Sequence, residues 1–200
     1  MKIEIISDDR VSSGKNLSRV AWELSRSPDD TTPLDTILSI DAPVNEIPSV
    51  VMSVQCTILE REIFASFRDH VMWARTSRVD APSEFVVPEY FQLSEDNDKI
   101  ILLKEKIKAD MDAGIIQDEY RLHMPISAMT SFTTRLSWRG LVKIYKLYQQ
   151  LAKINEYFIV GKTELNNKFQ LHKYAGNYSY VDPITPLFLS FSFSIGIGST

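Results

Sequence analysis

Cysteine and histidine are scarce in this 200-residue sequence, and their scarcity excludes several kinds of site. The single cysteine, Cys56, cannot form an intramolecular disulfide or build a thiolate metal centre. The three histidines, His70, His123 and His172, are far apart and lack the spacing of metal ligands. A phosphate-binding glycine loop, a metal-binding helix with two histidines and a nucleophile-elbow serine are also absent. The sequence therefore predicts no metal site and contains none of the common catalytic motifs.

Long apolar runs are missing as well. No stretch approaches the roughly 18 consecutive apolar residues of a membrane span, and the segment Met1–Ile6 is too short and too charged for a signal peptide. The net charge of -4 gives no general attraction to polymeric nucleic acid or to an anionic membrane. We expect a cytoplasmic protein with neither of those partners, in which a local basic cluster binds any anionic ligand.

The remaining composition is that of an ordinary globular protein. Hydrophobic residues make up 44% and charged residues 24% of the chain, whose length is sufficient for one well-buried core. Cys56 ends the apolar run Val50–Cys56, where it is expected to act as a small buried hydrophobe rather than as a nucleophile.

Hydrophobic periodicity predicts an α+β protein. Apolar and polar residues alternate in three expected strands, and apolar residues recur at helical spacing in five expected helices. The strands are expected at 2–6, 49–58 and 130–137, and the helices at 16–26, 34–40, 59–68, 99–113 and 138–158. The strand at 130–137 is expected to point Arg135 outward. The tail segment 186–198 alternates with serine and glycine on one side, which favours a strand or arm packed on its own core or on a neighbouring subunit.

Arginine placement is the strongest sign of a binding site. Arginine suits bidentate phosphate recognition, and the nearby Trp73 offers a surface on which a base can stack. An alternative is that these arginines are surface residues paired with nearby carboxylates such as Asp69, Asp80 and Glu84. The arginines in question are Arg68, Arg75 and Arg78 in one short segment, Arg121 before the sequence Leu-His-Met-Pro, and Arg139 near the start of the longest expected helix.

The order of several short motifs resembles that of flavin-dependent thymidylate synthases. The sequence Phe-Arg-Asp-His at 67–70 stands where that family has an Arg-His-Arg signature. Arg121 and Pro125 match an Arg-x-x-x-Pro step, and a threonine-rich strand follows. The sequence Ser-Trp-Arg-Gly-Leu at 137–141 then matches the family's Asn-x-Arg-x-Leu, with Arg139 kept. The resemblance spans residues 1–158, and residues 159–200 form a divergent C-terminal extension or arm.

Several positions depart from the family pattern. Asp69 replaces the signature histidine, His70 its second arginine, and Ser137 the asparagine. Ser77 and Arg78 stand where the family has Ser-x-Arg, but in a shifted register. Tyr148 falls at the position of a nucleotide-binding arginine on the long helix. So divergent a sequence would suit a viral protein.

The resemblance implies a central antiparallel sheet flanked by helices, in a homotetramer whose active sites form between subunits. It implies FAD as cofactor, NADPH as hydride donor, methylene-tetrahydrofolate as one-carbon donor and dUMP or a related deoxynucleotide as substrate. Methylation or hydroxymethylation of dUMP is the expected reaction, and the flavin would carry the electron chemistry.

The resemblance also assigns roles to residues of this sequence. The expected catalytic residues are Ser77, near the pyrimidine, and Arg121. The expected cofactor-binding residues are Arg68, His70, Arg78, Ser137 and Arg139. The expected substrate-binding residues are Arg68, Arg75, Arg121 and Tyr148. Two alternatives remain open: a catalytically silent homologue that serves as a nucleotide-binding or structural subunit of a larger assembly, and an α+β protein of another kind.

Overall fold

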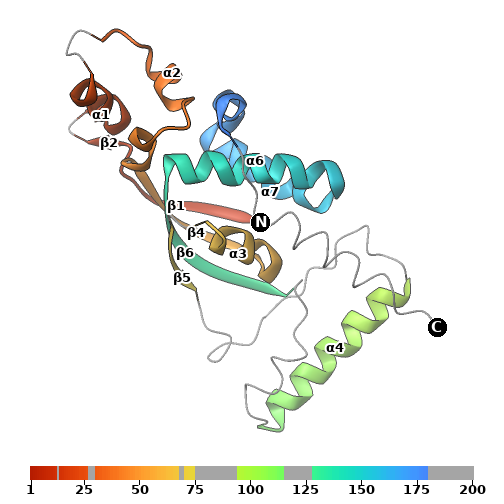
Figure 1. Ribbon diagram of the computed structural model, residues 1–200. Coiled ribbons are helices and arrows are strands. Elements are labelled where there is room, and N and C mark those ends of the chain that lie inside the picture. The colour runs from red at the N-terminus through yellow and green to blue at the C-terminus, as the bar shows by residue number, and fades with distance from the viewer. Residues whose placement is uncertain (13, 27–29, 68–69, 75–93, 115–127, 180–200) are drawn as a thin grey trace.

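A four-stranded antiparallel sheet with helices packed against it forms the centre of the molecule (Figure 1). The computed structural model describes residues 1–12, 14–26, 30–67, 70–74, 94–114 and 128–179. The strand order is β1-β4-β6-β5, and every neighbouring pair is antiparallel. The strands are β1 (Lys2–Asp8), β4 (Ser49–Thr57), β5 (His70–Ala74) and β6 (Met129–Ser137). The predicted α+β fold with a central antiparallel sheet flanked by helices is confirmed.

The side chains of Asn16, Thr57 and Ser137 cap the starts of three helices. Asn16 accepts hydrogen bonds from the backbone of Ser18 and Arg19 at the start of α1, and Thr57 forms a reciprocal capping box with Glu60 at the start of α3. The helices are α1 (Leu17–Ser25), α2 (Leu34–Leu38), α3 (Ile58–Ala65), α4 (Ser94–Asp112), α6 (Trp138–Ile154) and α7 (Tyr157–Phe169). Shorter elements are the hairpin β2 (Val11–Ser12) and β3 (Lys15–Asn16) and the 3-10 turns η1 (Pro43–Glu46), η4 (Leu171–Lys173) and η5 (Ala175–Asn177).

Two elements differ from the sequence-based expectation. The expectation of a single helix over 138–158 is wrong. Helix α6 ends at Ile154, and the extended backbone of Asn155 separates it from α7. The side-chain oxygen of Asn155 accepts the backbone N–H of Tyr157 at 2.9 Å, which starts the next helix. Strand β5 was not expected at all. The predicted boundary at residue 158 falls inside α7, and residues on both sides of it belong to one core cluster.

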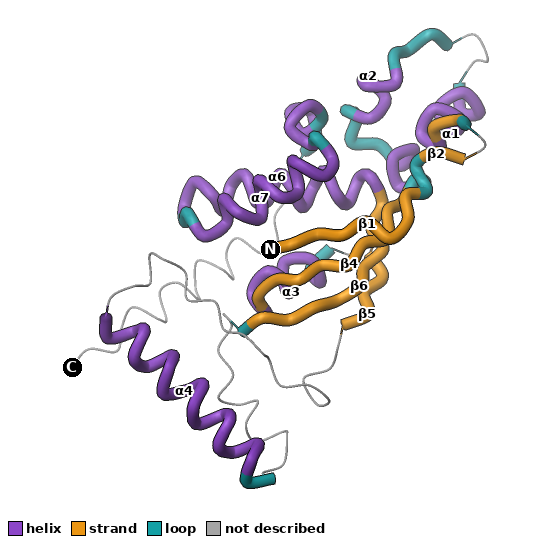
Figure 2. The backbone as a smooth tube through the Cα atoms, turned by 180° about the vertical axis from the view of Figure 1, so that it is seen from behind, coloured by secondary structure: helices purple, strands orange, loops and turns teal. Residues whose placement is uncertain are grey.

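The core lies between one face of the sheet and helices α3, α6 and α7 (Figure 2). Alternate residues of β4, namely Val50, Met52, Val54 and Cys56, are all completely buried. Because successive side chains of a strand point to opposite faces, this alternation identifies the covered face. The largest core side chains contributed by the helices and the C-terminal turn are Phe64, Trp138, Tyr148 and Tyr178.

The opposite face of the sheet is open among the described residues. Val71 and Trp73 on the edge strand β5 are 70% and 82% exposed. Arg135 on β6 lies opposite Val71 and is exposed, as the sequence predicted. Helix α4 stands apart from the sheet in both views, with Leu102 63% exposed (Figures 1 and 2). None of the helices in the described ranges is sufficiently long and apolar to cross a membrane.

Candidate functional site

The predicted site residues divide into those that the structure describes and those that it does not. Arg68, Arg75, Ser77, Arg78 and Arg121 lie outside the described residues. His70, Ser137, Arg139 and Tyr148 lie inside them, on strands β5 and β6 and on helix α6. The structure brings the first three of these four to one end of the sheet and places the fourth in the core.

Ser137 and Arg139 lie at the junction of β6 and α6. The Ser137 hydroxyl accepts the backbone N–H of Gly140 at 3.0 Å and thereby caps the helix. The backbone N–H of Trp138 donates to the carbonyl of Pro48 at 2.9 Å, which fixes the helix start against β4. Arg139 follows in the first turn, where the helix dipole attracts anions. The backbone that carries Ser137 and Arg139 is therefore fixed at this junction.

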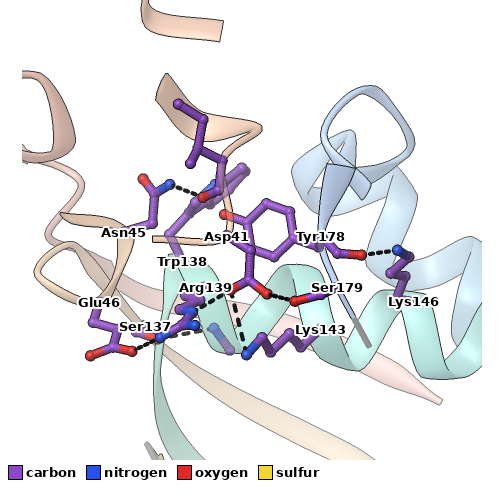
Figure 3. A network of polar contacts seen from close by, with 12 residues as sticks. Asp41, Asn45, Glu46, Ser137, Trp138, Arg139, Lys143, Lys146, Tyr178 and Ser179 are labelled. Carbon is purple, nitrogen blue, oxygen red and sulfur yellow. Dashed lines mark hydrogen bonds and ion pairs between the residues drawn. The ribbon is translucent and has the colours of Figure 1, made fainter. Parts of the chain in front are cut away.

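The Arg139 guanidinium contacts two carboxylates that the sequence analysis missed (Figure 3). Its Nε donates to Asp41 at 2.5 Å, and its Nη1 donates to Glu46. Desolvation alone would lower the pKa of Arg139, but the hydrogen bonds and charges of the two acids raise it above its usual value. Lys143, one turn further along α6, reaches Asp41 at 3.5 Å. Two acids and two bases thus lie side by side at the start of α6.

Asp41 is held on several sides. Desolvation raises the pKa of its carboxyl, but hydrogen bonds from Ser179 and Arg139 and the charge of Lys143 outweigh that effect, so the pKa lies below its usual value. The Ser179 hydroxyl donates to the second carboxylate oxygen at 2.5 Å. Asp41 is therefore ionised and fixed, and it joins α6 to the C-terminal segment of the described chain.

Buried hydrogen bonds set the position of the loop that carries Asp41 and Glu46. Asn45 is completely buried, and its amide nitrogen donates to the carbonyls of Ile37 and Ile40, each at 2.8 Å. Its amide oxygen accepts the hydroxyl of Ser18 at 2.8 Å. The Leu38 carbonyl is bound from two further sides, by the indole of Trp138 at 3.1 Å and the hydroxyl of Tyr178 at 3.0 Å. A loop with so many internal partners holds its acids in defined places.

His70 lies at the same end of the sheet as Ser137. It pairs in register with Leu136, the residue before Ser137, and its Nδ1 contacts the carbonyl of Phe67. The side chain is half-buried. The sequence had assigned His70 to cofactor binding, and that assignment stays a prediction.

Tyr148 lies in the core, although the resemblance places a nucleotide-binding residue at its position. Its side chain is completely buried, and its hydroxyl donates to Glu60 at 3.5 Å. Burial, followed by the nearby charge of Glu60, raises the pKa of Tyr148 well above its usual value. The ring packs against Phe64 and Phe158, with centroid distances of 6.5 and 6.0 Å. In this structure the side chain joins α3, α6 and α7.

Two further features lie outside the predicted site. Cys56 is buried, as expected, and desolvation raises the pKa of its thiol, so the reactive thiolate is disfavoured. A pocket of about 320 Å³ opens between α6 and α7, roughly 15–21 Å along the helix axis from Arg139. Its lining residues are Gln149, Ala152, Lys153, Ile159 and Lys162.

Comparisons with known proteins find structural relatives only. No protein-family model matches the sequence, and no curated protein matches it. Among solved structures, thymidylate synthase X (ThyX) from Helicobacter pylori with FAD and dUMP is 14% identical, with a TM-score of 0.68 over 88% of this chain and 96% of that chain. A second structure of the Helicobacter pylori flavin-dependent enzyme, with the same two ligands, is 13% identical and has a TM-score of 0.67.

A further similar structure is the UMP/dUMP methylase PolB from Streptomyces cacaoi bound with 5-Br dUMP. It is 13% identical, with a TM-score of 0.53 over 72% of this chain and 76% of that chain. At such identities a structural match reports the arrangement of the backbone rather than the chemistry of the site. The four-stranded antiparallel sheet, its covering helices and these matches together show that this chain has the fold of the flavin-dependent thymidylate synthases.

Proposed function

We propose that this chain binds FAD and dUMP and transfers a one-carbon group to the pyrimidine, as methyl or as hydroxymethyl. The observation that carries the proposal is the structural match to a FAD- and dUMP-bound synthase over 88% of this chain, in a chain that keeps Arg139 within the motif Ser-x-Arg-x-Leu. NADPH and methylene-tetrahydrofolate are the proposed hydride and one-carbon donors.

The residues at the β6–α6 junction fit an anionic cofactor. Arg139 is 23% exposed, and Asp41 and Glu46 contact its Nε and Nη1, so Nη2 completes a guanidinium edge that neither acid fills. Phosphate oxygens and flavin carbonyls both accept hydrogen bonds from such an edge. FAD would supply the redox chemistry of the reaction. Arg139 would bind and orient the cofactor, and Ser137 would hold the helix start on which Arg139 depends.

The other proposed roles belong to residues outside the described ranges. Arg68 and Arg78 would bind phosphates of FAD or of the nucleotide, and Arg75 and Arg121 would bind dUMP. Ser77 would lie beside the pyrimidine ring. Because these five residues and Arg139 come from separate parts of the sequence, the proposal requires that folding or subunit association brings them together.

A homotetramer with shared active sites is part of the proposal. The open sheet face with the exposed Val71 and Trp73 supports it, since large exposed apolar side chains on a sheet commonly mark an interface. Leu102 on α4 is another exposed apolar side chain that association would bury.

The first experiment is a titration of the purified protein with FAD, followed by flavin absorbance and fluorescence and by the mass in solution. Arg139→Ala should weaken FAD or dUMP binding about tenfold or more, because a charged hydrogen bond contributes about 1.5–3 kcal/mol. Arg61→Ala is the matched control, since Arg61 is also an ion-paired arginine but lies on α3 beside Glu62. A product of increased mass from dUMP would show the reaction. Its mass distinguishes methyl, which requires hydride from NADPH, from hydroxymethyl, which stays at the oxidation level of the donated methylene group and takes its oxygen from water. A protein that binds neither FAD nor dUMP would contradict the proposal.

The second candidate function is a catalytically silent homologue that serves as a subunit of a larger assembly. Two observations favour it. Asp41 and Glu46 already occupy donors of Arg139, and the core holds Tyr148 where the resemblance expects a nucleotide-binding residue. The protein would then ignore added FAD and associate stably with a partner chain, whereas a tetramer that retains flavin would exclude this function.

A further inference from the structure

Asp41 and Glu46 each contact one donor of the Arg139 guanidinium. Nε donates to Asp41 at 2.5 Å and Nη1 donates to Glu46, while no partner is recorded for Nη2 within the described ranges. A phosphate group binds a guanidinium best through two parallel N–H donors on one edge. Two edges offer this arrangement: Glu46 covers one donor of the Nη1–Nη2 edge, and Asp41 covers one donor of the Nε–Nη2 edge.

The two carboxylates also differ in how firmly they are held. The Asp41 side chain is only 10% exposed and has Lys143 and Ser179 as additional partners. The Glu46 side chain is 45% exposed, and among the described residues only Arg139 is recorded as its partner (Figure 3). Moving Asp41 would break several contacts in a buried place, whereas moving Glu46 into water breaks one exposed ion pair.

The charges balance only while Glu46 stays in place. Asp41, Glu46, Arg139 and Lys143 together carry no net charge. When the Glu46 carboxylate moves away, one positive charge is left at the start of α6, where the helix dipole also favours an anion. A bound phosphate oxygen would restore the balance.

We infer that Glu46 occupies the place of a ligand phosphate oxygen on Arg139 and that phosphate-bearing ligands bind by displacing Glu46, while Asp41 remains on Nε. The identity of those ligands as FAD or dUMP rests on the proposed function. The local sequence offers no sign that Glu46 pairs with Arg139, because the two residues are 93 positions apart.

Three variants test this inference by calorimetric titration with FAD, dUMP and inorganic pyrophosphate. Glu46→Gln removes the competing charge, and Glu46→Asp keeps the charge but shortens the side chain by one methylene. Asp41→Asn removes a charge from the neighbouring Nε–Nη2 edge and measures the effect of charge alone. Both Glu46 variants should bind about threefold to fivefold more tightly than the wild type, since an exposed ion pair contributes at most about that factor. The tightening in Glu46→Gln should exceed that in Asp41→Asn, although each removes one charge.

The outcomes separate this inference from the proposed function. If the wild type binds FAD or dUMP and the Glu46 variants bind no more tightly, the inference is overturned and the function stands. If the wild type binds neither ligand but the Glu46 variants gain affinity for pyrophosphate, the inference stands and the function fails. If Asp41→Asn tightens binding as much as Glu46→Gln does and Glu46→Asp does not tighten it, charge alone explains the effect and the displacement is overturned. If no protein binds any probe, both are overturned.

Discussion

On one face of the sheet Val50, Met52 and Val54 are completely buried beneath helices, whereas on the other face Val71 and Trp73 are 70% and 82% exposed. Both faces carry large apolar side chains, so composition does not distinguish them. The covered face is filled by α3, α6 and α7 of the same chain, and no described element fills the open face. The comparison indicates that the first face provides the stability of the fold, while the second leaves large apolar side chains exposed.

The largest expected effect is on the covered face. Phe132→Ala should lower the free energy of unfolding by about 3–5 kcal/mol, because it leaves a cavity beside Phe64. The centroids of the two rings are 5.4 Å apart. Phe132 is 3% exposed. Denaturant unfolding of the two proteins measures the difference, and a loss below about 1 kcal/mol would mean that the core is not packed as described.

A smaller effect concerns the buried tyrosine hydroxyls. The folded-state pKa of Tyr148 is raised, so its contribution to stability is complete below the unfolded value of about 10 and is lost as the pH rises further. Above that pH the unfolded chain gives up the proton first, and stability should fall by up to about 1.4 kcal/mol per pH unit for this group. The variant Tyr148→Phe should cost about 1 kcal/mol at neutral pH and should lose less stability above pH 10.

Urea unfolding at several alkaline pH values tests this prediction. Tyr157 and Tyr178 also have raised pKa values, chiefly because of burial. Any single tyrosine variant should therefore keep part of the wild type's loss of stability with rising pH. An equal slope in the wild type and in Tyr148→Phe would show that the Tyr148 hydroxyl is accessible to water in the folded protein.

The smallest effect on folding is expected on the open face. Trp73→Glu should change the free energy of unfolding of a single chain by about 0.5 kcal/mol or less, because the side chain has few contacts to lose. The same change should lower the mass in solution if this face joins subunits, since a charge in an apolar interface is costly. The mass in solution, measured by light scattering, tests whether this face joins subunits. An unchanged assembly would remove this face from the interface.

Local sequence was sufficient for most of the secondary structure. Alternation in 49–58 and 130–137 predicted strands that become β4 and β6, and Asn16 caps a helix close to the expected range. Two features were missed because tertiary contacts decide them. Asn155 ends α6 so that α7 can fold back on it, and β5 is a five-residue strand that depends on pairing with β6.

The candidate site was only partly predictable. The motif around Arg139 was visible in the sequence, but the acids that hold it were not, because Asp41 lies 98 residues earlier in a segment without a recognisable motif. The burial of Tyr148 was visible as helical periodicity, yet the resemblance assigned it to the ligand. Helical periodicity correctly placed this residue in the core, since an apolar stripe along a helix faces its neighbours.

By itself the sequence determined an α+β chain with a buried cysteine, an outward Arg135 and an arginine at the start of the helix that follows strand β6. These features follow from local periodicity and capping, which act over a few residues. Only the tertiary structure decided that Asp41 and Glu46 pair with Arg139, that Ser179 binds Asp41, and that one face of the sheet stays open among the described residues. Such contacts join residues far apart in the chain, and they form only when burial of the core has fixed the elements that carry them.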